Sequence, residues 1–210
     1  VRGISQEKIS EASLFQCTVI GEKLNIIEKL YFVMSQIFKV SDVIHKYLTK
    51  NDIDISEKSH FRIVQLNGPR IICSLDDDSV INDNNNNLEY RIEFVPNSQA
   101  NIPSGRLLRV TFSTNDKIPS NNCFGFPFFL RLYEEESFES TLNRINQTTS
   151  LALNLSLDEF SFLYSNDVSS SVYFVKLDAK TVLKDICTGK RTMLYIVPND
   201  KDGVTEKLSQ

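Results

Sequence analysis

The sequence predicts an α+β protein in which one small domain occurs twice. Three observations support this prediction. The length of 210 residues fits two domains of about 100 residues each, a common domain size. One block of residues recurs at a constant offset. Strand-like runs and one amphipathic helix also follow the same order in each half of the chain.

The repeated block is the clearest sign of duplication. Leu75-Asp76-x-x-Ser79-Val80-Ile81-x-Asp83 recurs as Leu177-Asp178-x-x-Thr181-Val182-Leu183-x-Asp185, and each copy leads into a run that ends in Val-Pro-Asn. The offset is constant, because 177 − 75 and 198 − 96 both equal 102. Self-similarity at a domain-sized period predicts two copies of one fold. It also argues against a single enzyme core, in which catalytic residues usually occur once.

In the first half, strand-like runs surround one predicted helix. Apolar and β-branched residues are concentrated in segments 14–20, 24–34, 61–66, 70–73 and 88–95. Val40, Ile44, Tyr47 and Leu48 recur at the spacing of one helix face, and Ser41 is the expected N-terminal cap. Asn67-Gly68 predicts a tight turn, because both residues tolerate positive φ. The polar stretches 51–60 and 82–87 are expected to be connections.

The second half repeats this order. Its strand-like runs are 107–112, 126–133, 160–164, 172–175 and 193–197. Pro127 has no amide donor, so its strand is expected to begin there or to lie at a sheet edge. Ser137 is the predicted cap of a helix whose apolar face carries Phe138, Leu142 and Ile145. Ser156-Leu157-Asp158-Glu159 has capping-box spacing and predicts a short helical turn.

This order of elements predicts two tandem β-grasp domains. Two strands, a helix that packs across them and further strands that return beside the first form this arrangement, because the helix needs a sheet face to cover. The predicted domains are 14–97 and 106–198, with 98–105 as a linker and 199–210 as a C-terminal tail.

Composition and charge exclude several functional classes. A net charge of −4 gives no basic face for nucleic acid. The absence of a long apolar stretch and of a signal peptide predicts an intracellular protein, cytoplasmic or nuclear, without a membrane partner. The widely spaced cysteines at 17, 73, 123 and 187 indicate core thiols rather than a metal or redox site. We therefore expect no metal, no cofactor and no catalytic residue, with His45 and His60 at the surface.

At particular residues the chain resembles a known family. Phe126-Pro127-Phe128-Phe129-Leu130-Arg131-Leu132, with the acidic run 134–136 and Asn143-Arg144-Ile145, resembles the last ubiquitin-like domain of the herpesvirus-associated ubiquitin-specific proteases. Phe61-Arg62-Ile63, Arg70-Ile71-Ile72 and the run from Tyr90 to Pro96 resemble the penultimate domain of the same enzymes. The similarity covers roughly residues 15–198.

This resemblance implies a non-catalytic regulatory region of a ubiquitin-specific thiol protease (a deubiquitinase). In that family the final pair of ubiquitin-like domains folds back on the catalytic domain and favours its active state. The implied partners are that catalytic domain and substrate or regulatory proteins. In animal members the activating element includes an apolar, basic tail, whereas the only sizeable apolar residues of 199–210 here are Val204 and Leu208. Activation through the folded domains, or no activation, therefore stays open.

The candidate contact residues are few. Asp76, Asp77 and Asp78 form an acidic run that could dock a basic peptide, and Val204 and Leu208 are the apolar residues of the tail. A short acidic run is also typical of a solvated turn. An adaptor of two β-grasp domains that docks partners without affecting catalysis is the alternative function, because a fold alone does not fix a partner.

Overall fold

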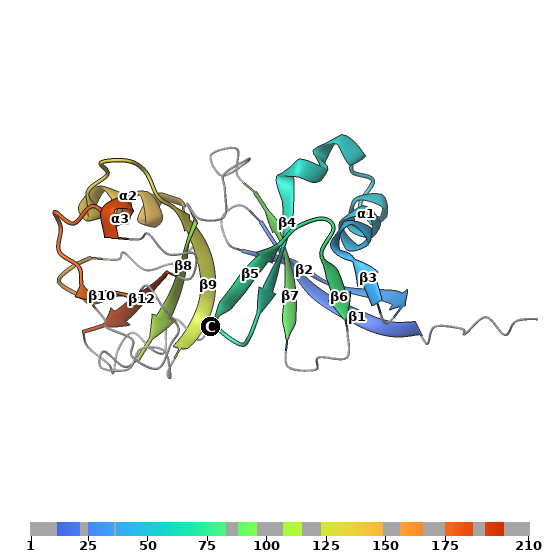
Figure 1. Cartoon of the computed structure of the whole chain (residues 1–210), viewed down its shortest axis with the longest axis horizontal. Coiled ribbons are helices and arrows are strands. Elements are labelled where there is room, and N and C mark those ends of the chain that lie inside the picture. The colour runs from blue at the N-terminus through green and yellow to red at the C-terminus, as the bar shows by residue number, and fades with distance from the viewer. Residues whose placement is uncertain are drawn as a thin grey trace, which may run out of the picture.

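The computed structural model describes residues 12–21, 25–35, 37–82, 88–95, 107–114, 123–148, 156–165, 175–186 and 192–199. These residues form two five-stranded mixed sheets and one two-stranded sheet, with few helices, so the chain has an α+β fold (Figure 1). In Figure 1 the second-half strand β9 (Cys123–Arg131) lies beside the first-half strand β5 (Ile71–Leu75). The helices of the two halves lie on the far sides of the two sheets.

The first sheet has the strand order β2-β1-β7-β4-β5. Its strands, besides β5, are β1 (Ala12–Ile20), β2 (Ile26–Ser35), β4 (Phe61–Leu66) and β7 (Glu89–Phe94). The first and last strands of this half, β1 and β7, run parallel at the centre of the sheet, and the other pairs are antiparallel. Helix α1 (Val40–Lys50) and the 3₁₀ helix η1 (Ile55–His60) follow the short strand β3 (Ile37–Lys39), which pairs with β6 (Val80–Asn82).

The second sheet has the order β11-β10-β12-β8-β9. Its strands, besides β9, are β8 (Leu107–Ser113), β10 (Phe160–Ser165), β11 (Val175–Lys176) and β12 (Met193–Pro198), and its helices are α2 (Phe138–Thr148) and α3 (Leu183–Ile186). Strands β8 and β12, again the first and last of their half, are parallel neighbours. Numbered along the chain within each half, the main-sheet strands of both halves have the order 2-1-5-3-4.

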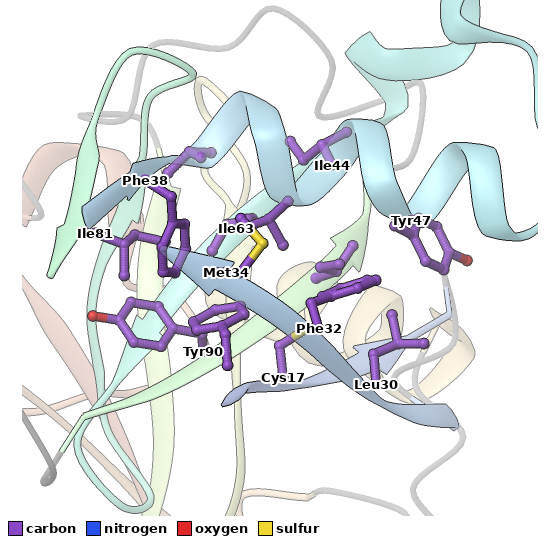
Figure 2. Close-up of a cluster of buried hydrophobic side chains, with 14 of the residues drawn as sticks. Cys17, Leu30, Phe32, Met34, Phe38, Ile44, Tyr47, Ile63, Ile81 and Tyr90 are labelled. Atoms are coloured by element: carbon purple, nitrogen blue, oxygen red, sulfur yellow. The ribbon is translucent and has the colours of Figure 1, made fainter. Parts of the chain in front are cut away.

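Helices α1 and α2 each cover one face of their own sheet, which we call its inner face. The apolar side of α1, with Val43, Ile44 and Tyr47, packs on strand residues such as Phe32 and Ile63 (Figure 2). In the second half, Phe138 of α2 is fully buried and its ring meets that of Phe162 edge-on, with centroids 4.9 Å apart. The apolar spacing therefore predicted the faces of both helices correctly, because buried residues recur every three or four positions on a helix.

The repeated block is a turn that holds the start of each helix. In the first copy the carbonyls of Ser79 and Asp77 accept hydrogen bonds from the amides of Val40 and Ser41, at 3.0 and 3.1 Å. In the second copy the carbonyls of Thr181 and Ala179 accept from the amides of Phe138 and Glu139, at 2.7 and 3.2 Å. The first amides of a helix have no partner within the helix, so the turn satisfies them.

The hydroxyl in the block stabilises the turn itself. The amide of Asp76 donates to Ser79 Oγ at 3.1 Å, and the amide of Asp178 donates to Thr181 Oγ1 at 3.2 Å. A hydroxyl that accepts a backbone amide closes a tight turn. This explains why the two copies share a serine or threonine at the same place.

Some predicted details differ from the structure. Helix α1 begins at Val40, and the amide of Lys39, not a cap at Ser41, closes its first turn by donating to the Asp42 carboxylate at 3.0 Å. For Pro127, by contrast, the prediction is confirmed, because Pro127 lies within β9 and β9 is an edge strand. The register shifts opposite it, between Val110 and Phe112.

Other differences concern short elements. The connection 51–60 contains η1, and the second copy of the block ends in α3 where the first copy forms β6. Ser137 is confirmed as a cap of α2, since its Oγ accepts the Ser140 amide at 3.3 Å. At Ser156, predicted to open a short helical turn, the structure has a hydrogen-bonded turn. The predicted linker 98–105 and the tail after Asn199 lie outside the described residues.

Candidate functional site: the joint between the two sheets

The two sheets meet along an apolar contact. Val64, Leu66 and Ile71 from β4 and β5 form a buried cluster with Phe129 of β9, and Leu107 of β8 packs against it. Val64 and Leu66 of β4 belong to this cluster, whereas Ile63 of the same strand belongs to the core under α1. Both faces of the first sheet are therefore used, one by its helix and part of the other by the second half.

A buried carboxylate with two guanidinium groups lies beside this cluster. Glu93 Oε2 accepts from Arg62 Nε at 2.7 Å and lies 2.6 Å from Arg62 Nη2. Glu93 Oε1 accepts from Arg91 Nε at 2.9 Å and also from Arg91 Nη2. The Glu93 and Arg91 side chains are only 3% and 2% exposed, and Arg62 is 13% exposed. We call these three residues the Arg62–Glu93–Arg91 network.

The network belongs to the first half but contacts the second half directly. Arg91 Nη2 donates to the Pro127 carbonyl at 2.9 Å, and its guanidinium lies 4.4 Å from the centre of the Phe126 ring. The Arg62 guanidinium lies 4.5 Å from the centre of the Phe129 ring. Guanidinium groups over aromatic faces are attracted by the ring quadrupole, more so when water is excluded.

The hairpin between β4 and β5 adds two more contacts. Thr111 Oγ1 donates to the Pro69 carbonyl at 2.6 Å, and Arg70 Nε approaches Cys123 Sγ at 3.3 Å. Gly68 within this hairpin has a φ of +54°, which glycine adopts without strain. The turn predicted at Asn67-Gly68 therefore brings backbone acceptors of the first half against β8.

Electrostatics favour the ionised form of Glu93. Burial alone would raise the pKa of its carboxyl, but the charges of Arg91 and Arg62 and their hydrogen bonds outweigh burial and lower that pKa. Loss of one partner from such a buried set leaves an unpaired charge, which costs about 3–5 kcal/mol. The network thus holds Arg62 and Arg91 where they contact the second half.

A pocket opens beside the joint. Its volume is about 770 Å³. Its walls come from β1, the start of β2, the β4–β5 hairpin, β7 and β9, and include Thr18, Ile26, Pro69, Glu89, Arg91 and Phe126. A ligand in this pocket would touch both halves.

The residues predicted to contact partners lie elsewhere in the chain. Asp76, Asp77 and Asp78 form the turn of the first repeated block, where the Asp77 carbonyl accepts the Ser41 amide. Asp78 is almost fully exposed and pairs with Lys39 at 3.3 Å. Val204 and Leu208 lie outside the described residues, so their role stays a prediction.

The network residues could have been found in the sequence. Arg62, Arg91 and Glu93 interrupt strand runs that are otherwise apolar. Arg91 and Glu93 are two positions apart, so they lie on the same face of β7. Opposite charges at that spacing within an otherwise apolar strand indicate a buried ion pair.

The described thiols and imidazoles differ in exposure. Burial, with a contribution from Glu28, raises the pKa of Cys17 to about 12, so this thiol stays protonated. His45 is exposed on α1, and His60 stacks on Phe94 and pairs with Glu57. Within the described part of the chain, no group of three or more His, Cys, Asp or Glu side chains could hold a metal ion. Among the same residues, no helix has the length and apolar character needed to cross a membrane.

The motifs quoted for the family resemblance meet at this joint. Arg62 and Arg91 come from the first-half motifs, and Pro127 and Phe129 come from the second. Consistent with this, the family model described as ubiquitin-specific protease C-terminal matches residues 5–202. The chain belongs to this family. No curated protein matches the chain.

Membership in the ubiquitin-specific protease C-terminal family confirms the broader part of the resemblance. The match extends across residues 5–202 and therefore covers both sheets and the joint of this chain. Within this ubiquitin-specific protease C-terminal region, the described residues contribute packing and hydrogen bonding at the joint.

Proposed function

We propose that the chain is a non-catalytic regulatory and docking region of a ubiquitin-specific cysteine protease. In this proposal it folds back on the catalytic domain of its parent protein and favours the active state. Family membership supports the assignment to the C-terminal region. The observation that carries the proposal is the Arg62–Glu93–Arg91 network against Pro127, which locks the two halves into one body.

We further propose that both halves are β-grasp domains, the penultimate and last ubiquitin-like domains of an array. The order 2-1-5-3-4, the parallel pairing of first and last strands, and a helix across one face support this in each half. The proposed domains are 14–97 and 106–198. We propose that the protein acts in the cytoplasm or nucleus.

A locked pair of domains suits a regulator of a neighbouring domain. A tethered module acts at high effective concentration, and it shifts an equilibrium only by its differential affinity for the two states. A module whose halves are already fixed loses less conformational freedom on docking. More of its binding free energy is then available to favour the active state.

The test compares cleavage of a ubiquitin conjugate by the parent catalytic domain alone and fused to this chain. We expect higher turnover with the fused chain, and a loss of that increase in Arg91→Ala, which removes the contact with Pro127. Arg62→Met is a second variant, in which the apolar stem of this partly exposed side chain is kept and its charge is removed. Arg131→Ala is the control, because Arg131 stacks on Tyr133 within its own half.

The outcomes separate the two candidate functions. Unchanged turnover with the fused wild-type chain would contradict the regulatory role. It would favour the adaptor function, in which the pair docks substrates or regulatory proteins without affecting catalysis. The pocket beside the joint is the observation that supports this second function. Asp76, Asp77 and Asp78 stay proposed contacts in either case, as do Val204 and Leu208.

A further inference from the structure

Exposed apolar side chains of the described residues are concentrated on one strand. Four of the ten large hydrophobic residues found exposed belong to β2, namely Ile26, Ile27, Tyr31 and Val33. Solvent-facing positions of an antiparallel pair are normally polar. A row of apolar residues on a strand of this kind indicates a surface that binds another molecule.

The row lies on the outer face of the β1–β2 pair. Ile27, Tyr31 and Val33 are 57%, 56% and 66% exposed, at alternate positions of β2, while Leu30, Phe32 and Met34 face the core. Leu14 of β1 is the register partner of Val33 and is 65% exposed. The apolar surface therefore spans two neighbouring strands.

Strand β2 is also the edge of its sheet. Among the described residues, the order β2-β1-β7-β4-β5 leaves one side of this ten-residue strand without a neighbouring strand. Such an edge offers backbone donors and acceptors to an added strand, in which alternate side chains give specificity. An exposed edge and an apolar row on the same strand favour an extended partner over a helical one.

Lysine side chains define the charge at this edge. Lys29 is exposed within the row. Lys46 of α1 donates from Nζ to the Val33 carbonyl at 2.8 Å. Lys46 is exposed on α1. Lys50 is paired with Glu28 at 3.0 Å. Of the described lysines near this strand, Lys29 and Lys46 are therefore the ones that an incoming strand would meet.

These charges discriminate between two occupants. If a second copy paired antiparallel through β2 about Tyr31, Lys29 of one copy would lie opposite Val33 of the other. Lys46 is bonded to that Val33, so two ammonium groups would approach each other. Like charges in an interface are destabilising. A strand with carboxylates would instead meet both lysines favourably.

We propose that the edge of β2 binds an extended segment of a partner protein that carries both apolar and acidic residues. The segment adds a strand beside β2. Lys29 shares the outer face with Tyr31 and Val33, so on that face apolar side chains of the segment cover Tyr31 and Val33 and a carboxylate pairs with Lys29. A carboxylate at an intervening position pairs with Lys46. Ile26 also lines the pocket beside the joint, but Lys29, Tyr31, Val33 and Lys46 do not, so the inference does not depend on the proposed regulatory role.

The experiment uses the full chain and labelled peptides of the length of β2. One peptide (Val–Glu) places Val opposite Tyr31 and Val33 and Glu opposite Lys29 and at the intervening positions, a second (Val–Lys) has Lys in place of each Glu, and a third is the Val–Glu peptide with a central Pro. We expect saturable binding of the Val–Glu peptide by fluorescence anisotropy, with amide shift changes centred on β2. We expect binding at least about tenfold weaker for the Val–Lys peptide, and a similar loss with Pro, which removes a strand donor.

Protein variants test the charge assignment. Lys29→Glu combined with Lys46→Glu should reverse the preference between the Val–Glu and Val–Lys peptides. Lys176→Glu is the matched control, because Lys176 is an exposed lysine on β11, the edge strand of the other sheet. Equal affinity for the two peptides, shift changes outside β2, or no binding would overturn the proposal. A dimer formed through β2, seen by sedimentation of the chain alone, would assign the edge to a second copy instead.

Discussion

Neutralising Glu93 tests the joint most directly. In Glu93→Gln the shape of the side chain is kept, but Arg62 and Arg91 lose the carboxylate that balances their charges. Arg91 and the substituted residue stay almost fully buried, whereas Arg62 keeps 13% of its side-chain surface exposed. Breaking a buried charge pair costs about 3–5 kcal/mol. Because Arg91 keeps its bond to Pro127 and the amide oxygen still accepts one donor, we expect about 3 kcal/mol, the lower end of that range.

The assay is urea unfolding followed by tyrosine fluorescence, since the chain has seven tyrosines and no tryptophan. Glu57→Gln is the matched control, because the Glu57 side chain is 53% exposed and pairs only at the surface with His60. Its expected loss is about 0.5 kcal/mol or less. If Glu93→Gln and Glu57→Gln lower the free energy of unfolding equally, the network does not stabilise the joint and the reasoning fails.

Three further predictions concern pH, the core and the thiols. The folded-state pKa of Glu93 is lowered, so the stabilisation that Glu93 gives is present above its unfolded pKa and is lost as pH falls through its folded pKa. Glu93→Gln should therefore flatten the acid limb of a plot of unfolding free energy against pH. Phe138→Ala should cost about 3–5 kcal/mol in urea unfolding, because a fully buried ring is removed from the second core. With iodoacetamide at mildly alkaline pH, Cys17 should stay unmodified in the folded chain, because burial raises its pKa to about 12, while half-buried Cys73 should react faster. Equal labelling rates of the two cysteines, measured by mass spectrometry of the digested protein, would contradict this.

Local patterns in the sequence predicted most of the secondary structure. The apolar faces of α1 and α2 and the strand runs follow from periodicity, which is a local property. The repeated block predicted duplication, but not that its carbonyls hold the first amides of each helix. That role depends on residues about 40 positions apart, such as Val40 and Ser79, which no local pattern connects.

The joint was harder to predict for the same reason. No sequence pattern connects Arg91 with Phe126 and Pro127, which β9 brings against it in the structure. Pro127 was expected at a strand start or a sheet edge, and its place on an edge strand is what the structure has. The contact across the joint is a property of the two halves together, so only the three-dimensional arrangement reveals it.

The central position of the first and last strands of each half has a consequence for synthesis. Strand β1 leaves the ribosome first, yet its parallel neighbour β7 is the last strand of that half to be made. The β1–β2 and β4–β5 pairs can form earlier, but β7, which joins them, is missing until about the whole half has emerged. The second half repeats this delay with β8 and β12. Because non-local pairing is slow to form, nascent chains that stop short of β7 or β12 should depend most on chaperones.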